Sequence, residues 1–449
     1  MNTPDLHALP RVFSHLATAN LAAQAAEQIS LAAVPIVAVL LFAAGAREVG
    51  LLAAAQSLPF LLLALPFGLW ADRASRRHLM IAAEALRVLA MAALAALVFV
   101  AGGAALSMTA LALLGFAGAV GTVAFSVAAP AMVPSLVPRA ALARANGRLE
   151  LARSLAFAAG PALAGAVVAA LGGGAAFALA ALLSAVAVWQ LRHLPRDAAR
   201  AGPAPAEAAG STPMAGAGGS GPGVAAVAPA PSASPWTPLR EGAGFVWHDR
   251  WLRPMLLTAV VWNLSWMMLQ AAYVPHAMQH LGLGARGVGL TLSLYGGGMV
   301  LGALAAPRLM ARLPLGVAIV FGPLVSVAAA LTMAASLAWP QPALAALSFF
   351  LFGAGPIVWT VSSTTLRQTL TPAAMLGRVG SIFLTANAGA RPLGAALGAG
   401  VAALAGAQGI AACLLLAAAG FVAQAGLVMA SALRTLRTLP AAPAARPVA

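Results

Sequence analysis

The sequence predicts an all-α membrane protein with twelve transmembrane helices, divided into two bundles of six. Three observations support this fold class. The chain is 62% hydrophobic and only 8% charged, its apolar stretches are long, and one polar stretch separates the sixth of them from the seventh. About 20 apolar residues span a bilayer as a helix, so stretches of this length indicate transmembrane helices. This composition excludes a soluble globular protein.

The twelve expected helices follow one another with short connections. We place them near residues 13–43, 49–69, 79–101, 104–133, 148–171, 174–192, 253–279, 286–306, 314–337, 342–365, 376–404 and 408–433. Glycine and proline mark several junctions, such as Gly172-Gly173-Gly174. Prolines inside the expected helices, such as Pro35, are compatible with transmembrane helices because neighbouring groups satisfy the freed backbone atoms.

A stretch of small residues divides the chain into domains. Residues 196–244 are rich in Ala, Gly, Pro and Ser and contain few large apolar side chains, so they cannot form a core. We therefore expect an N-terminal six-helix bundle over 1–195 and a disordered cytoplasmic linker over 196–244. A C-terminal six-helix bundle over 245–433 and a cytoplasmic tail over 434–449 follow.

An internal repeat relates the two bundles. Five residues recur 234 positions later: Gly68 as Gly302, Pro138 as Pro372, Leu142 as Leu376, Arg144 as Arg378 and Gly160 as Gly394. One shared offset is stronger evidence than any single match. The repeat predicts two pseudo-symmetric halves with a binding site between them.

The charge distribution predicts the topology. All 25 basic residues are arginine, and 20 of them fall in the loops, linker and termini of one side. Cytoplasmic loops carry such an excess, so we expect both termini in the cytoplasm of a bacterium, with the helices in its inner membrane. The same bias explains the net charge of +15, so the charge does not indicate that the protein binds nucleic acid. We expect a monomer in the lipid bilayer, with no cofactor and no metal. Cys413 is the single cysteine of the sequence, so it forms no intrachain disulfide.

A charged segment joins the second and third expected helices. Its residues Gly68, Asp72, Arg73, Arg76 and Arg77 form the pattern G-x-x-x-D-R-x-x-R-R. This pattern resembles the signature loop of the major facilitator superfamily, although serine stands where the family usually has a second glycine. The alternative is an ordinary basic loop. The resemblance implies the major facilitator fold and a loop that latches the two halves in one state.

Other segments resemble one branch of that superfamily, which holds enterobactin exporters and macrolide efflux proteins. They are Val49–Gln56, Arg144-Ala145-Asn146-Gly147 and Arg391-Pro392-Leu393-Gly394. The fifth helix also resembles the antiporter motif of exporters around Gly160-Pro161, with alanine at two of the usual glycines. These resemblances imply efflux of a drug, siderophore or similar metabolite, including multidrug resistance or siderophore export. The fourth helix lacks the arginine that many proton-coupled members carry.

Ionisable residues inside transmembrane helices are costly and therefore candidates for function. Glu27 lies within the first helix and Arg391 within the eleventh, at similar depths of roughly 21–23 Å from the cytoplasmic ends. All ten acidic residues lie at or before Asp249, so the C-terminal bundle offers Arg391 no carboxylate. We expect Glu27 to carry the proton and Arg391 to pair with it in one state. A permanent structural ion pair is the alternative.

The remaining candidates concern the gate and the substrate. Glu84 and Arg87, at i and i+3, adjoin the charged loop and are assigned to the gate, with a structural ion pair as the alternative. Polar and aromatic side chains on shared helix faces suit a cavity for an amphipathic organic molecule. They are Asn20, Gln24, Trp262, Asn263, Trp266, Gln270 and Trp359. An interfacial aromatic belt is the alternative for the tryptophans.

These observations predict a secondary transporter, a proton-linked antiporter that exports a small amphipathic compound by alternating access. An importer or lysophospholipid flippase on the same fold remains an alternative, because a fold does not define a substrate or a direction. A non-transporting membrane sensor is a further alternative. No nucleophile, metal cluster or nucleotide-binding loop in the sequence indicates an enzyme.

Overall fold

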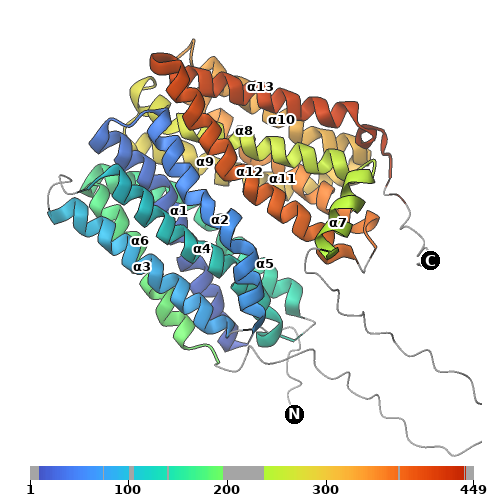
Figure 1. The fold of residues 1–449 in the computed structure, drawn as a ribbon, viewed down its shortest axis with the longest axis horizontal. Coiled ribbons are helices and arrows are strands. Elements are labelled where there is room, and N and C mark those ends of the chain that lie inside the picture. Colours follow the sequence, from blue (N-terminus) through green and yellow to red (C-terminus); the bar gives the residue numbers. More distant parts are fainter. Residues whose placement is uncertain are drawn as a thin grey trace, which may run out of the picture.

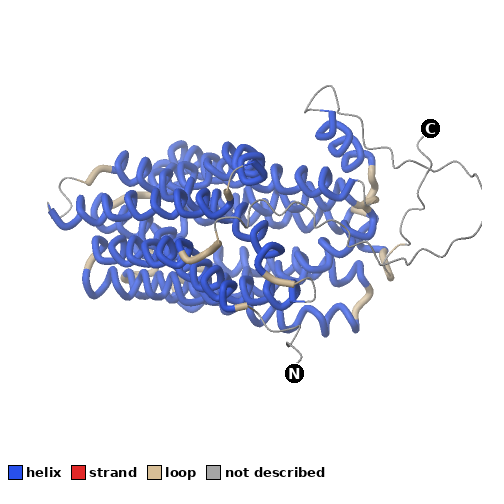
Figure 2. The backbone as a smooth tube through the Cα atoms, turned by 90° about the horizontal axis from the view of Figure 1, so that it is seen from below, coloured by secondary structure: helices blue, strands red, loops and turns tan. Residues whose placement is uncertain are grey.

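The structure is a computed structural model that describes residues 10–73, 75–100, 106–138, 141–195, 237–372, 375–438 and 440. These residues form helices and connections without a strand (Figure 2). The helices of the first half are α1 Arg11–Phe42, α2 Ala46–Arg73, α3 Arg76–Val100, α4 Met108–Leu136, α5 Leu142–Leu171 and α6 Gly173–Arg192. Those that follow are α7 Thr237–His248, α8 Leu252–Gln279, α9 Ala285–Arg312, α10 Leu315–Ala335, α11 Pro342–Leu370, α12 Leu376–Ala405 and α13 Gly409–Ala430.

The described chain contains eleven stretches that are long and apolar enough to span a membrane. The last of them, Arg378–Ala430, includes both α12 and α13, which are separated by a short 3₁₀ turn at Gly406–Gln408. Counting these two helices separately gives the twelve long helices that the sequence predicts. The all-α fold class is therefore confirmed.

The two halves form separate bundles that repeat the same packing (Figure 1). α5 and α12 are both 30 residues long and begin 234 residues apart. A Cβ atom on Gly160 of α5 would lie 2.5 Å from Gln28 of α1, and a Cβ on Gly394 of α12 would lie 2.5 Å from the Leu264 carbonyl of α8. Each glycine thus permits close packing against the first long helix of its own half.

The bundles are packed together at one end of the molecule. A Cβ on Gly289 of α9 would lie 2.3 Å from the Pro161 carbonyl oxygen of α5, and one on Gly50 of α2 would lie 2.9 Å from the Ala399 nitrogen of α12. Lipid is as apolar as these helices, so close backbone contact rather than hydrophobic burial holds them together. From this packed end the bundles diverge toward the end that carries the start of α1 and α7 (Figure 1).

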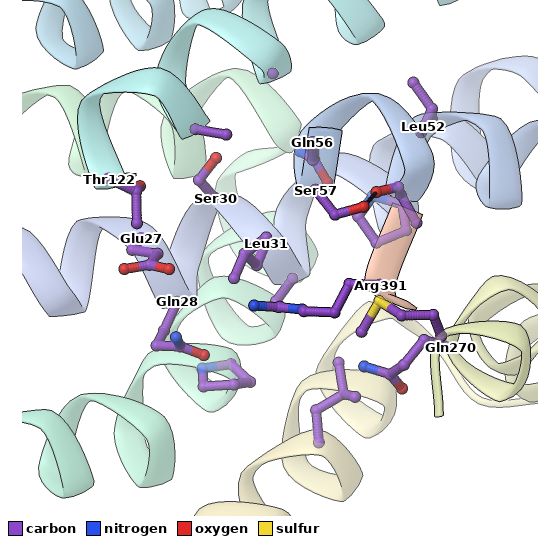
Figure 3. A pocket seen from close by; sticks show the side chains of 18 of the residues that line it. Glu27, Gln28, Ser30, Leu31, Leu52, Gln56, Ser57, Thr122, Gln270 and Arg391 are labelled. Atoms are coloured by element: carbon purple, nitrogen blue, oxygen red, sulfur yellow. Dashed lines mark hydrogen bonds between the residues drawn. The ribbon is translucent and has the colours of Figure 1, made fainter. Parts of the chain in front are cut away.

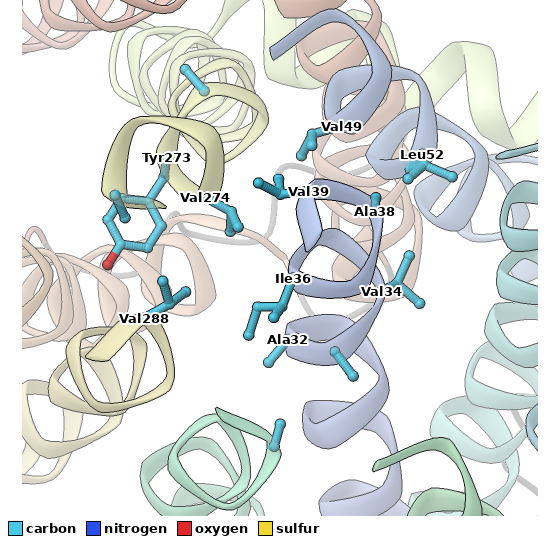
Figure 4. Close-up of a cluster of buried hydrophobic side chains, with 14 of the residues drawn as sticks. Ala32, Val34, Ile36, Ala38, Val39, Val49, Leu52, Tyr273, Val274 and Val288 are labelled. Carbon is cyan, nitrogen blue, oxygen red and sulfur yellow. The ribbon is translucent and has the colours of Figure 1, made fainter. Parts of the chain in front are cut away.

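Apolar side chains fill the packed end. Figure 4 shows Ile36 and Val39 of α1 facing Val274 of α8 and Val288 of α9, one half against the other. Ile36 and Val288 are fully buried. This cluster joins the halves at one end only, which leaves space between them farther along the bundles.

α7 is a short helix between the two bundles in sequence. It begins at Thr237, so the last part of the range 196–244 that we expected to be linker is helical. Its Glu241 forms an ion pair with Arg378 near the start of α12. This contact fastens α7 to the C-terminal bundle. Residues 196–236 lie outside the described residues, so the disordered tether remains a prediction.

The charged segment Gly68–Arg77, which we expected to join the second and third helices, is largely helical rather than a loop. α2 continues through Gly68 and Asp72 to Arg73, and α3 begins at Arg76. The connection between α2 and α3 is therefore shorter than the ten-residue charged segment. α4 also begins later than expected, at Met108, because the Ser107 side chain accepts a hydrogen bond from the Ala110 amide and caps the helix.

Candidate functional site

A cavity of about 490 Å³ lies between the two bundles. Helices α1 to α5 contribute its wall on one side, and α8, α9, α11 and α12 contribute the other. Its volume falls within the range of about 300–1,000 Å³ that is common for small-molecule sites. Polar side chains from both halves line it, among them Gln24, Glu27, Gln28, Gln56, Arg87, Arg153, Asn263, Gln270 and Arg391 (Figure 3).

Glu27 and Arg391 both line this cavity, one from each half. Each is half-buried. They form no ion pair within 4.0 Å in this conformation, so the direct pair that we expect in one state is not formed here. Arg391 instead lies over the ring of Phe60, 5.1 Å from its centroid. The structure thus brings the two residues to one cavity without joining them.

Aromatic rings form one wall of the cavity. The rings of Trp262 and Trp266 are stacked with centroids 5.5 Å apart, and Trp266 stacks in turn on Tyr295 of α9 at 5.1 Å. Trp262 is held by a hydrogen bond of 3.2 Å from its Nε1 to Ser326 Oγ. These rings lie inside the protein and contact one another, which differs from an interfacial belt. They give this wall of the cavity a rigid aromatic lining.

Glu84 and Arg87 form a buried ion pair within the N-terminal bundle. Arg87 Nη1 lies 3.1 Å from Glu84 Oε1 and donates to the Ala23 carbonyl at 2.9 Å, and Nη2 donates to Thr122 Oγ1 at 2.7 Å. These contacts join α3 to α1 and α4. Because every partner belongs to the same bundle, the pair has the geometry of the structural alternative. Its role in gating is still a prediction.

Arg77 is also bound within the N-terminal bundle. Its Nε donates to the Leu191 carbonyl at 3.1 Å and its Nη2 to the Arg192 carbonyl at 2.7 Å. These carbonyls end α6 and have no partner within that helix. In this conformation Arg77 therefore joins α3 to α6 rather than one half to the other. Arg76 is the first residue of α3, and the positions of the Asp72 and Arg73 side chains lie outside the described structure.

Two residues that we expected in the cavity lie elsewhere. Asn20 is one helical turn from Gln24, and its Nδ2 donates to the Leu149 carbonyl at 3.2 Å, which fastens α1 to α5. Trp359 packs against Gly322 of α10, on the side of α11 that faces away from the cavity. The other expected residues, Gln24, Trp262, Asn263, Trp266 and Gln270, do line the cavity.

Several lining residues were not expected from the sequence. Arg153 lines the cavity, and its guanidinium lies 5.5 Å from the Phe157 ring centroid. Phe60 and Tyr295 had no distinguishing sequence signal. Gln56 had one, because it is a lone amide within the apolar part of α2. An isolated polar residue in a transmembrane helix is a candidate for a cavity.

The comparisons with known proteins agree with this geometry. The model of the Major Facilitator Superfamily matches residues 16–395, and the chain belongs to that family. The nucleoside transporter NupG is similar in structure, with a TM-score of 0.69 and 14% identity over 94% of this chain and 99% of that one. A bacterial homologue of the iron transporter ferroportin in an inward-facing state gives 0.66 and 19% identity, over 93% of this chain and 99% of that one.

A third similar structure is a bacterial homologue of the human lysosomal transporter Spinster, inward-facing and unoccupied. It has a TM-score of 0.61 and 15% identity over 96% of this chain and 97% of that one. No curated protein matches the chain. At these identities the structures show the fold alone. The chain is a multi-pass membrane transporter of the Major Facilitator Superfamily, a family of transporters rather than enzymes.

Proposed function

We propose that this protein is a proton-linked exporter of a small amphipathic organic compound, working by alternating access in a bacterial inner membrane. The observation that carries the proposal is the cavity between the two halves, with Glu27 on one wall and Arg391 on the other. The arginine-rich end is the cytoplasmic end, and the cavity opens toward it when the opposite end is packed. A compound from the cytoplasm enters the cavity in this conformation.

Glu27 is the site of protonation in this proposal. Burial disfavours the charged form of a carboxyl group, and a nearby arginine favours it. Glu27 makes no hydrogen bond to any other described residue, so its proton affinity depends on its burial and on the charges around the cavity. Movement of one half relative to the other changes the separation of Glu27 and Arg391. The proton affinity of Glu27 then differs between the two states, which is the requirement for coupling.

A transport assay with a matched control tests the role of Glu27. The exported compound is first identified as the one that remains inside cells when the gene is deleted. The protein is then reconstituted in liposomes with a trapped pH dye, and that compound is added. We expect proton movement with the wild type and its loss in Glu27→Gln, with binding of the compound retained.

Glu48→Gln is the matched control, because Glu48 accepts a hydrogen bond from the Gly45 amide at 2.9 Å and does not line the cavity. It should transport as the wild type does. If Glu27→Gln moves protons at the wild-type rate between pH 6 and pH 8, Glu27 is not the coupling residue, and Asp72 and Glu84 become the candidates.

The alternative functions are separated by the direction of the change in cells. Deletion of an exporter leaves its compound inside, whereas deletion of an importer leaves it in the medium. A lysophospholipid flippase would change the distribution of lipid between the two leaflets and leave the soluble metabolites unaltered. The fully internal position of the aromatic wall favours a compound that fits inside the cavity over a lipid tail.

A further inference from the structure

We propose that the compound bound in the cavity is an organic anion with a flat unsaturated portion, and that Arg391 binds its anionic group. The inference rests on the proposed transport function, because it names the class of compound that occupies the same cavity. It follows from the charge balance around Arg391, from the contacts that Arg391 makes, and from the shape of the aromatic wall.

The C-terminal half has no carboxylate for Arg391. From Arg250 onward the sequence contains no Asp or Glu. The two acidic residues just before are engaged at the surface: Glu241 pairs with Arg378, and Asp249 Oδ1 accepts from the Trp251 and Leu252 amides at 2.8 Å. A buried charge is costly unless an opposite charge or hydrogen bonds compensate it. A negative charge to pair with Arg391 must therefore come from the other half or from a ligand.

The other half supplies one carboxylate to the cavity. Among the described residues that line it, Glu27 is the only acidic side chain, whereas Arg87, Arg153 and Arg391 are basic. Arg87 is compensated by Glu84 beside the cavity. Glu27 lies farther than 4.0 Å from Arg391 and forms no ion pair with it in this conformation. The cavity is then an environment that favours a negatively charged ligand.

The guanidinium N–H groups of Arg391 can donate hydrogen bonds to a ligand. Its contact among the described residues is with the face of Phe60, and it forms no hydrogen bond or ion pair with any of them. A guanidinium binds a carboxylate, sulfonate or phosphate through two parallel N–H···O bonds. A bound anion would therefore pair with Arg391 in this conformation, in which Glu27 does not.

The rest of the cavity favours a flat compound. The rings of Trp262, Trp266 and Tyr295 stack on one another and all line the cavity, so an aromatic or conjugated group bound there would contact aromatic surface. Two buried amide atoms in the wall also lack a partner among the described residues, Gln28 Nε2 as a donor and Gln270 Oε1 as an acceptor. They can bind polar groups on the compound. A cavity of about 490 Å³ accommodates a molecule with both parts.

Binding of matched compounds tests this inference. A panel of bicyclic aromatic compounds is prepared in carboxylate, sulfonate, phosphate, carboxamide and ammonium forms. Each is titrated by calorimetry into the full chain in lipid nanodiscs. We expect at least one anionic form to bind about ten- to hundred-fold more tightly than its carboxamide, as charge-assisted hydrogen bonds provide. The ammonium forms should not bind. The order among the three anionic forms identifies the anionic group.

The Arg391 variants locate the anion. Arg391→Gln should remove the preference for anions, whereas Arg391→Lys should keep part of it and shows that the variant chain folds. Arg286→Gln, at an exposed arginine of the same half outside the cavity, is the control and should bind as the wild type does. Equal binding of the carboxamide, tighter binding of the ammonium form, no binding of any anion, or an unchanged preference in Arg391→Gln would overturn the inference.

Counterflow in liposomes separates this inference from the proposed function. If only the neutral or cationic compounds are carried, transport stands and the anion site is wrong. If anions bind at Arg391 but no compound crosses the membrane, the site stands and the transport proposal is wrong. Anions that bind at Arg391 and are carried support both.

Discussion

Alanine at Gly289 would test whether the packed end of the molecule must separate during transport. A Cβ atom there would lie 2.3 Å from the Pro161 carbonyl oxygen and 2.9 Å from the Gly165 Cα, both in the backbone of α5. An ordinary contact needs 3.4 Å or more, so α9 and α5 must move apart by about 1 Å. Backbone atoms cannot turn away as a flexible side chain can, so the contact between the two halves absorbs this shift.

Overpacking of a close contact costs about 1–3 kcal/mol. In the opposite state of an alternating-access cycle this end is open and the methyl group meets no backbone. The variant should therefore shift the equilibrium between the two states by about 5- to 150-fold, away from the conformation described above. The measurement is a distance distribution by electron resonance between spin labels at Arg47 and Arg286, in a Cys413→Ser background. We expect the longer distances to gain population.

Gly297→Ala is the matched control. Gly297 lies on the same helix, and a Cβ atom there would meet nothing within 4 Å. Both variants gain the same helix propensity of alanine over glycine, about 1 kcal/mol, so any difference between them comes from the contact with α5. Equal distance distributions for the two variants, in proteins that are both folded, would refute the reasoning.

Two further predictions concern segments whose side chains lie outside the described structure. Removal of residues 205–230 should leave transport nearly unchanged, since a doubling of loop length costs only about 0.6 kcal/mol; loss of transport in a chain that still reaches the membrane would show that the linker does more than connect the halves. Asp72→Asn should slow turnover more than it weakens binding of the compound, if the signature segment latches one state. Weaker binding at an unchanged cycling rate would contradict the latch.

Much of the fold follows from the sequence, because its determinants are local. A transmembrane helix needs enough apolar length, and this is visible without knowledge of its neighbours. The twelve long helices and the offset of 234 residues between the starts of α5 and α12 were predictable in this way. The helix α7 was not, because a stretch with glycine at 242 and 244 depends on tertiary contacts such as the packing of the buried Val246 in the C-terminal core.

The chemical part of the site was also partly predictable. Glu27 and Arg391 stand out because a charge within a transmembrane helix is expensive, whatever surrounds it. The structure brings both to one cavity, although their distance and their partners could not be derived from the spacing along the chain. The pair of Glu84 and Arg87 was predictable as well, since i and i+3 side chains are neighbours on any helix.

Only the tertiary structure decided which face of each helix lines the cavity. Gln24 lines it, whereas Asn20, one turn away, bonds to the Leu149 carbonyl, and Trp359 packs on α10 instead. In a soluble protein the apolar face of a helix is the buried one, but here the lipid-facing and protein-facing surfaces are both apolar. Aromatic residues such as Phe60 and Tyr295 are compatible with either surface. Their place at the cavity depends on how the two bundles meet, which no single helix encodes.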